Sequence, residues 1–449
     1  LAVFAIGLFP YLYFFVRAKT AVMPVAWSYP DSLPAFLRLI FRSDYGTFAP
    51  TVGSDPALVT LADKGQQLFK FFNYFLEDFW WPIIIPIILG LFVGLKKYWR
   101  FTVFILLAFF LSGIFFLTYA NFPITDQTGF GLAAVERFYL LPYLFLALLA
   151  GLGISYLSNL RILSLILITF YAVMLLINNF GLINQKNNFW GENLGRNILS
   201  TVPENGLLLV QGDIPTFAVF YTHYVENFRP DIQIFTPNVA GQFNDYRYLR
   251  SVRPSLDYGS GKILTIPEFI VKNYQKISLS SYGQSKAEIT ALPSYQKGLI
   301  TIFGGGKSYP VKLPDYQLPA PEEFKNHNTL ADYTLLWYYA RMNTNLGKIC
   351  FDNQDYNCAR DFLQKALVYT PNQLYLVRTL GLIYEKEQKC DQAEQEYKKI
   401  LVLNPKALFA FSDLANLTKN CFKDEARAKY WQEQMAGRQN GPAMSLQEL

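Results

Sequence analysis

Long apolar runs dominate the first 180 residues of the chain. A run crosses a bilayer when it has about 20 apolar residues, each adding about 1.5 Å. Such runs occur at roughly 1–16, 80–95, 101–120, 138–157 and 161–180. The second run is short and begins in Phe79-Trp80-Trp81, an aromatic stretch typical of a membrane interface. The pattern predicts about five membrane spans, followed from residue 181 by a large soluble region.

Residues 31–46, between the first two runs, have helical periodicity. Apolar side chains recur at the spacing of one helix face, at Leu33, Phe36, Leu37 and Ile40. Asp31 or Ser32 can cap this helix, and Arg38 and Arg42 lie four residues apart on another face. We expect the helix to lie in the membrane interface. Its arginines would then bind either a specific phosphate or ordinary lipid headgroups.

The soluble region begins with a strand, helix, strand pattern. Residues 207–213 form a buried strand ending in Gly212-Asp213, residues 216–227 have helical spacing, and residues 232–235 form a second strand. This order predicts a βαβ unit with a parallel sheet. Asp213 at the strand end can be catalytic, although capping the following helix is the commoner role. Residues 299–303 predict a further strand, with a glycine turn after it.

Beyond residue 336 the chain repeats with a period of 34 residues. Leu346-Gly347, Ala359, Ala366 and Pro371 recur as Leu380-Gly381, Ala393, Ile400 and Pro405. A third unit keeps Leu414, Ala426 and Tyr430 if one residue is deleted. The period and the small residues predict tetratricopeptide repeats. Such repeats offer a surface for a peptide or protein partner, or they cover the membrane region.

These patterns predict a multi-domain membrane protein. Residues 1–180 would form an α-helical transmembrane bundle with an external loop at 17–79, residues 181–335 a small α/β domain, and residues 336–449 an all-α tetratricopeptide domain. Hydrophobic residues make up 52% of the chain and charged residues 16%, too apolar a balance for an ordinary soluble protein. The net charge of +6 is spread along the chain and does not favour nucleic acid.

Charged residues in the short loops predict the topology. Lys96, Lys97 and Arg100 follow the second run, and Arg161 follows the fourth. Short loops rich in Lys and Arg stay in the cytoplasm, which leaves the region after residue 180 outside. All four cysteines lie in that region, and an oxidising compartment permits disulfides. We predict Cys350–Cys358 and Cys390–Cys421; the alternative is four small buried hydrophobic residues.

Familiar catalytic motifs do not occur in the sequence. There is no HExxH, paired CxxC, Gly-x-Ser-x-Gly or Walker motif, and Gly304–Lys307 is expected to be a turn. Of the two histidines, His223 is expected to be a satisfied surface residue and His327 has no partner motif. We therefore predict no metal and no cofactor.

Glu136 and Arg137 stand directly before the fourth apolar run. A charged side chain at the centre of a bilayer costs about 2.5–3.5 kcal/mol for Arg, and less near the interface. Charge kept at this depth therefore marks a candidate site, with a structural interfacial ion pair as the alternative.

Several segments of the chain resemble one family. They are Trp27–Asp31 through Arg42–Gly46, Glu136–Pro142, Gly212-Asp213 with Phe217 and Tyr221, and Arg229-Pro-Asp231. They occur in this order in the transmembrane-protein-260-like protein O-mannosyltransferases, which are GT-C glycosyltransferases. The resemblance implies transfer of mannose from a polyprenyl-phosphate carrier to a hydroxyl of an exported protein. It also implies an integral membrane protein, which we place in the plasma membrane of a prokaryote in preference to the endoplasmic reticulum.

The resemblance extends to individual residues and also has a gap. Arg137 matches the family motif and would bind the carrier phosphate, with Glu136 orienting it; Arg42 and Arg38 are further candidates. Trp27, Tyr45 and Tyr139 are candidate contacts for the donor, the acceptor or membrane lipid. The acidic catalytic residue of GT-C enzymes has no counterpart here. Since the chain begins at Leu1 inside a span, we expect it to be the C-terminal part of such an enzyme.

Two other functional classes remain open. One is a non-catalytic membrane scaffold whose repeats recruit a partner, and the other is a transporter of the lipid-linked sugar. A transporter would be expected to carry charges in mid-span and inverted repeats, and the predicted spans contain essentially no charge.

Overall fold

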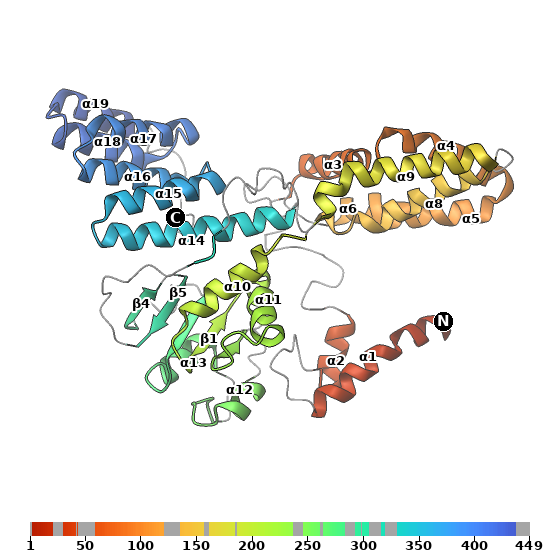
Figure 1. Cartoon of the computed structure of the whole chain (residues 1–449), viewed down its shortest axis with the longest axis horizontal. Coiled ribbons are helices and arrows are strands. Elements are labelled where there is room, and N and C mark those ends of the chain that lie inside the picture. Colours follow the sequence, from red (N-terminus) through yellow and green to blue (C-terminus); the bar gives the residue numbers. More distant parts are fainter. Residues whose placement is uncertain are drawn as a thin grey trace. The chain divides into compact units, whose positions relative to one another are not determined.

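The computed structural model describes residues 2–20, 30–41, 43, 59–120, 135–156, 161–184, 186–236, 246–260, 264–282, 292–297, 299–304, 316–318 and 330–436. The chain forms two compact units. The first, here the membrane unit, is built mainly from Leu1–Ala21 and Ser28–Asn188. The second, here the C-terminal unit, is built mainly from Phe189–Asn326 and Leu335–Leu449 (Figure 1).

Every predicted apolar run in the membrane unit forms a helix. The elements are α1 (Ala2–Thr20), α2 (Leu33–Ile40), α3 (Leu61–Phe79), η3 (Trp81–Ile83), α4 (Ile84–Lys97), α5 (Trp99–Phe110), the π-helix η4 (Leu111–Phe115), α6 (Phe116–Tyr119), α8 (Leu140–Tyr156) and α9 (Arg161–Ile183). Among the residues described, Trp99–Tyr119 is by itself long and apolar enough to cross a membrane. Leu61–Phe79 and Trp81–Lys97 meet that test only as a pair, bent by 99°. The count of five spans stays a prediction.

Two glycines bring α4 and α8 into backbone contact. A Cβ atom on Gly90 would lie 1.7 Å from the carbonyl oxygen of Leu149. A Cβ atom on Gly153 would lie 2.0 Å from the carbonyl oxygen of Pro86. Apolar helices in lipid associate largely through close van der Waals packing, which small residues permit. These two glycines therefore set the distance between the helices.

Helix α3 lies within residues 17–79, where the sequence pattern predicts an external loop. Thr60 and Asp63 form a capping box, in which Asp63 Oδ2 accepts a hydrogen bond from Thr60 N at 2.8 Å. Gln67, Phe71 and Phe75 recur every four residues on the buried face. The pattern is amphipathic rather than uniformly apolar, so a search for long apolar runs does not detect it. The short helix at residues 31–46 is confirmed as α2, and Ser32 provides the cap.

The C-terminal unit contains a five-stranded sheet. Its strands are β1 (Leu207–Val210), β2 (Gln233–Phe235), β3 (Leu279–Tyr282), β4 (Ser294–Lys297) and β5 (Ile300–Phe303), in the order β2-β1-β3-β5-β4. β1 is parallel to β2 and β3, whereas β5 is antiparallel to β3 and β4. The predicted βαβ unit and the strand at 299–303 are confirmed. β3 and β4 were not predicted, since polar Ser280 and Ser281 interrupt the apolar pattern of β3.

Helices cover both faces of this sheet. They are α10 (Trp190–Thr201), α11 (Asp213–Phe220) with the π-helix η6 (Tyr221–Val225), α12 (Arg247–Val252) and α13 (Ile266–Asn273). On β1, Leu208 and Val210 share a core with residues of α10 and α11. Leu207 and Leu209 share another core with residues of α12 and α13. A strand buried on both faces is apolar throughout, as in parallel α/β sheets.

Six helices follow the sheet. They are α14 (Leu330–Asp352), α15 (Tyr356–Tyr369), α16 (Leu374–Lys386), α17 (Cys390–Leu403), α18 (Leu408–Asn420) and α19 (Glu425–Ala436). α17 begins 34 residues after α15, and α18 begins 34 residues after α16. This spacing agrees with the predicted repeat, and its assignment as tetratricopeptide stays a prediction. Tyr339 of α14 donates a hydrogen bond to the Trp190 carbonyl at 2.6 Å, so α14 also packs into the core of the sheet.

The predicted register of the third repeat is wrong. Ala428 is buried and Trp431 packs into the repeat core, whereas Ala426 and Tyr430 are exposed. The turn before α19 is one residue longer than the turn before α17, because four residues separate α18 from α19 and three separate α16 from α17. The third unit therefore contains an insertion and not the expected deletion.

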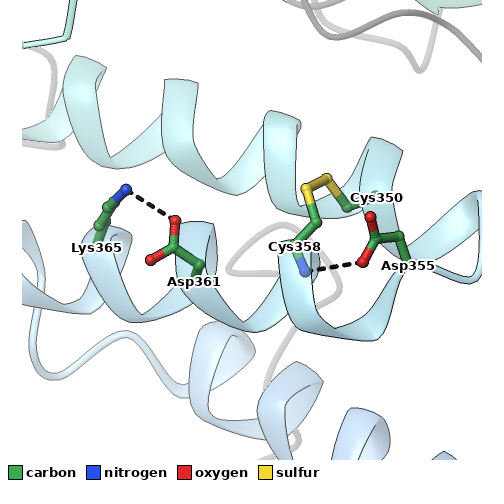
Figure 2. The surroundings of a disulfide bond; sticks show 5 residues. All are labelled: Cys350, Asp355, Cys358, Asp361 and Lys365. Carbon is green, nitrogen blue, oxygen red and sulfur yellow. Dashed lines mark hydrogen bonds and ion pairs between the residues drawn. A yellow bond between two sulfur atoms is a disulfide. The ribbon is translucent and has the colours of Figure 1, made fainter.

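Both predicted disulfides are present. Cys350 and Cys358 join α14 to α15 with their Cα atoms 5.7 Å apart (Figure 2). Cys390 and Cys421 join the start of α17 to the end of α18, with Cα atoms 5.9 Å apart. Beside the first bridge, Asp355 caps α15 by accepting a hydrogen bond from Cys358 N at 3.0 Å (Figure 2). The alternative of four unpaired buried cysteines is wrong.

Candidate functional site

The charged pair Glu136 and Arg137 lies in a single turn that leads into α8. Phe138 N donates to the Val135 carbonyl at 2.9 Å, and Tyr139 N donates to the Glu136 carbonyl at 2.9 Å. Val135 and Tyr139 are buried, which anchors the turn at both ends. Arg137 is exposed, and its Cζ atom lies 5.7 Å from the centre of the Phe138 ring. The turn therefore presents a guanidinium group to the surroundings of the bundle.

Glu136 lies in an unusual electrostatic environment. Its carboxyl group is half-buried just before α8, and this desolvation raises its pKa to about 6, with the negative charge of Asp78 adding to the effect. Asp78 lies at the end of α3, where its carbonyl accepts a hydrogen bond from Asn179 Nδ2 at 3.3 Å. Two carboxyl groups far apart in the sequence thus influence each other at this end of the bundle. In the sequence, the one signal that marks Asp78 is its position directly before the aromatic stretch Phe79-Trp80-Trp81, and it was not among the predicted site residues.

Aromatic residues pack around the turn that carries Glu136 and Arg137. Tyr139 contacts Phe71 of α3 edge to face, with ring centres 5.2 Å apart. Tyr143 of α8 donates a hydrogen bond to the Phe71 carbonyl at 2.5 Å, and Tyr171 of α9 donates one to the Phe79 carbonyl. These contacts tie α3 to α8 and α9. Tyr139 was predicted as a donor or acceptor contact; its side chain is buried, and its hydroxyl has no hydrogen-bond partner within the described structure.

The other predicted phosphate contacts lie on or beside α2. Arg38 is partly exposed on α2, whose Phe36 packs against Phe15 of α1 with ring centres 5.2 Å apart. Trp27, Arg42 and Tyr45 lie outside the described residues. A phosphate site shared by Arg38, Arg42 and Arg137 therefore stays a prediction.

Gly212 and Asp213 lie at the carboxyl end of β1. Gly212 has φ of 94° and is the N-cap of α11 without a side-chain hydrogen bond. Asp213 is the first residue of α11, so the expectation that it caps the helix is wrong; at this position its negative charge favours the helix dipole. The Tyr338 hydroxyl lies 3.3 Å from where a Cβ atom on Gly212 would be. Burial raises the pKa of Tyr338 to about 12, with Arg341 opposing the shift and Asp213 adding to it.

His223 differs from its prediction as a surface residue. It is 8% exposed in η6, and its Nδ1 atom lies 3.2 Å from the Phe228 carbonyl oxygen. Desolvation lowers its pKa, since burial disfavours the imidazolium form. It is a buried histidine in contact with backbone.

Comparison with known proteins points to one family. The model of TMEM260-associated domain 2 matches residues 191–241. The mouse protein O-mannosyl-transferase TMEM260 is 29% identical over 255 residues, which cover 51% of this chain and 34% of that protein. The Dictyostelium discoideum protein O-mannosyl-transferase tmem260 is 26% identical over 260 residues, covering 52% and 31% respectively. The chain is similar to the TMEM260 proteins over about half of its length. It spans about a third of the length of these curated relatives, and no solved structure matches it.

The matched TMEM260 domain contains the Arg229-Pro-Asp231 motif, which acts structurally here. Arg229 donates hydrogen bonds from Nε and NH2 to the Asp231 carboxylate at 2.9 and 2.8 Å. The same guanidinium donates to three carbonyl groups at the end of α10, those of Leu199, Val202 and Pro203. The hydrogen bonds that Arg229 donates to the Asp231 carboxylate hold the pKa of Asp231 well below its usual range. Through these hydrogen bonds, the motif connects the end of α10 to the segment before β2.

Within the ranges that the structure describes, no group of three or more His, Cys, Asp or Glu residues is arranged to hold a metal ion. The charged groups near the turn before α8 are the Arg137 guanidinium and the carboxyl groups of Glu136 and Asp78.

Proposed function

We propose that the chain is part of a membrane mannosyltransferase of GT-C type. In this proposal mannose passes from a polyprenyl-phosphate carrier to a hydroxyl of an exported protein. The observation that carries it is the exposed Arg137 on a turn whose two ends are buried. The names of the TMEM260 relatives support the reaction class.

Arg137 is proposed to bind the carrier phosphate. A guanidinium group forms two parallel charge-assisted hydrogen bonds with phosphate oxygens, which a lysine ammonium does not reproduce. Glu136 would limit the rotamers of Arg137 through its ionised carboxylate, and burial raises the pKa of that carboxyl group to about 6. Tyr139 and Tyr143 support the turn from inside the bundle.

The C-terminal unit is proposed to lie outside the cytoplasm. Both disulfides support this placement, because such bonds persist in oxidising compartments and are rare in the cytosol. The lysine and arginine residues around the α4–α5 turn support the same topology. An exported acceptor protein would then meet the C-terminal unit, and its repeats are a candidate surface for that acceptor or another protein.

Replacing Arg137 with lysine in the full-length enzyme tests the proposal. Loss of one charge-assisted hydrogen bond is worth about 1.5–3 kcal/mol, so transfer from the lipid-linked sugar should fall by roughly ten- to hundredfold. Arg100→Lys is a matched control, because Arg100 also lies beside an aromatic ring, with its Cζ atom 5.6 Å from the centre of Trp99. Equal activities of the Arg137→Lys enzyme and the wild type would overturn the role of Arg137.

A further inference from the structure

An exposed apolar stripe runs along α11 and η6. Phe217, Tyr221 and Val225 follow one another every four residues and are 52%, 49% and 70% exposed. Residues at this spacing lie on one side of a helix. The stripe therefore joins two aromatic rings and an aliphatic side chain on the surface of the C-terminal unit.

The packing of α10 determines which side of α11 is exposed. A Cβ atom on Gly195 of α10 would lie 2.4 Å from the Ala218 carbonyl oxygen and 2.6 Å from Thr222 Oγ1. Ala218 and Thr222 thus face α10 at backbone distance. Phe217 and Tyr221 each precede one of these residues by one position, which turns them about a quarter of the way around the helix. The side of α11 that carries Ala218 and Thr222 packs against α10, so the apolar stripe lies on a different side of the helix, which is exposed.

The chain connects this pair of helices to an apolar helix over a short distance. α9 ends at Ile183 and α10 begins at Trp190, so six residues join them. Even fully extended, this connection spans at most about 25 Å. Phe189, the last residue of the connection, is 51% exposed. If α9 crosses the membrane as its sequence predicts, the start of α10 stays close to the lipid headgroups.

The charges at the end of the stripe are compatible with a lipid surface. Glu226 follows Val225 directly, and its carboxylate pairs with Arg196 of α10. Arg196 also pairs with Glu192 at 2.9 Å. Paired charges are less costly to bring towards a medium of low dielectric constant than an isolated carboxylate.

We propose that Phe217, Tyr221 and Val225 rest on the bilayer surface and dock the C-terminal unit onto lipid. Aromatic side chains are enriched at the membrane interface because their rings are apolar and, in Tyr, carry a polar tip. An amphipathic helix binds there with its apolar face at the boundary between headgroups and acyl chains. This interaction does not depend on mannosyl transfer.

The test places a nitroxide label on the stripe in the full chain. Tyr221→Cys is labelled without reduction, since the four native cysteines form two disulfides, and is reconstituted in phosphatidylcholine nanodiscs. Collision rates with oxygen and with a water-soluble nickel complex give the depth of the label. We expect a depth of about 5–10 Å below the headgroup surface. Val402→Cys on α17, at a position that is 81% exposed, is the control and should remain in water.

Each outcome decides the proposal. A label at position 221 that is as open to the nickel complex as the label at position 402 would overturn lipid docking. A label shielded from both reagents would also overturn it, and would indicate that protein covers the stripe. Val225→Cys repeats the measurement at a side chain that is 70% exposed, in case the Tyr221 variant does not fold.

Discussion

At the scale of single residues, membership in a sequence motif and a role in chemistry prove to be different properties. Arg229 and Asp231 belong to the most specific part of the family resemblance, and their side chains serve to fix the end of α10. Arg137 belongs to the same resemblance and is exposed on an anchored turn. The sequence alone does not separate these cases, because both are short charged motifs beside a proline or an aromatic residue.

Replacing Asp231 with asparagine should destabilise the C-terminal unit at neutral pH. The pKa of Asp231 is depressed in the folded state, so the ionised carboxylate stabilises the fold above its ordinary pKa of about 4. This contribution is lost as the pH falls further, and the difference between variant and wild type should shrink in acid. Thermal unfolding of both proteins at several pH values measures this difference in stability. Asp361→Asn, which breaks a solvent-exposed pair with Lys365, should change the melting temperature little.

The pH dependence of transfer should report on Glu136. Its pKa is raised to about 6, so the carboxyl group is mostly protonated below pH 6 and ionised above it. If the ionised form orients Arg137, kcat/KM of the full-length enzyme should decline below pH 6. Glu136→Gln should remove that decline, whereas Glu192→Gln in the C-terminal unit should keep it. If kcat/KM of the Glu136→Gln variant still declined below pH 6 as in the wild type, this role of Glu136 would be excluded.

At the scale of elements, uniformly apolar segments were predictable from the sequence, whereas some segments of mixed polarity were not. Apolar runs gave correct positions for α4, α5, α8 and α9, because the apolar residues of each helix form one long uninterrupted run in the sequence. α3 was missed because only one of its faces is buried. The strand β3 was missed because its serines are buried by strands and helices distant in the sequence.

Alanine at Gly153 should separate α4 from α8. The added methyl group would meet the Pro86 carbonyl at 2.0 Å, so the backbones must move apart. We expect a lower melting temperature in detergent, measured by aggregation of the purified protein on heating. Gly151→Ala is the matched control on the same helix, since nothing lies within 4 Å of its added Cβ atom. Equal losses in the two variants would contradict the proposed contact.

Removing the Cys390–Cys421 bridge should destabilise the repeat helices. The bridge closes a loop of 31 residues, and a disulfide of this loop length typically contributes about 2–4 kcal/mol. Cys390→Ser with Cys421→Ser should therefore unfold α17–α19 at a lower temperature, measured by hydrogen exchange of their amides. The Cys350–Cys358 bridge closes a separation of only 8 residues, so its removal should cost less. Protection that is unchanged in the first variant would show that packing alone holds these helices.

At the scale of the whole molecule, the side of the membrane on which the C-terminal unit lies decides whether it can meet an exported acceptor. After mild reduction, a membrane-impermeant thiol reagent should label the cysteines between residues 350 and 421 on intact cells. The reason is the predicted topology, which places positively charged short loops in the cytoplasm. The membrane unit contains no cysteine and provides no background. Labelling only after permeabilisation would reverse the topology and remove the exported acceptor from the proposal.

Local periodicity was sufficient to predict the apolar helices, the βαβ unit, the 34-residue spacing and both cysteine pairs. Each of these depends on residues that are neighbours in sequence or separated by one repeat, so the pattern itself carries the information. The tertiary structure alone decided that Asp78 influences Glu136, that Arg229 reaches the end of α10, and that α14 packs into the core of the sheet. These relations join segments far apart in the chain. They depend on how helices and strands pack, which the hydrophobic pattern of any one segment does not contain.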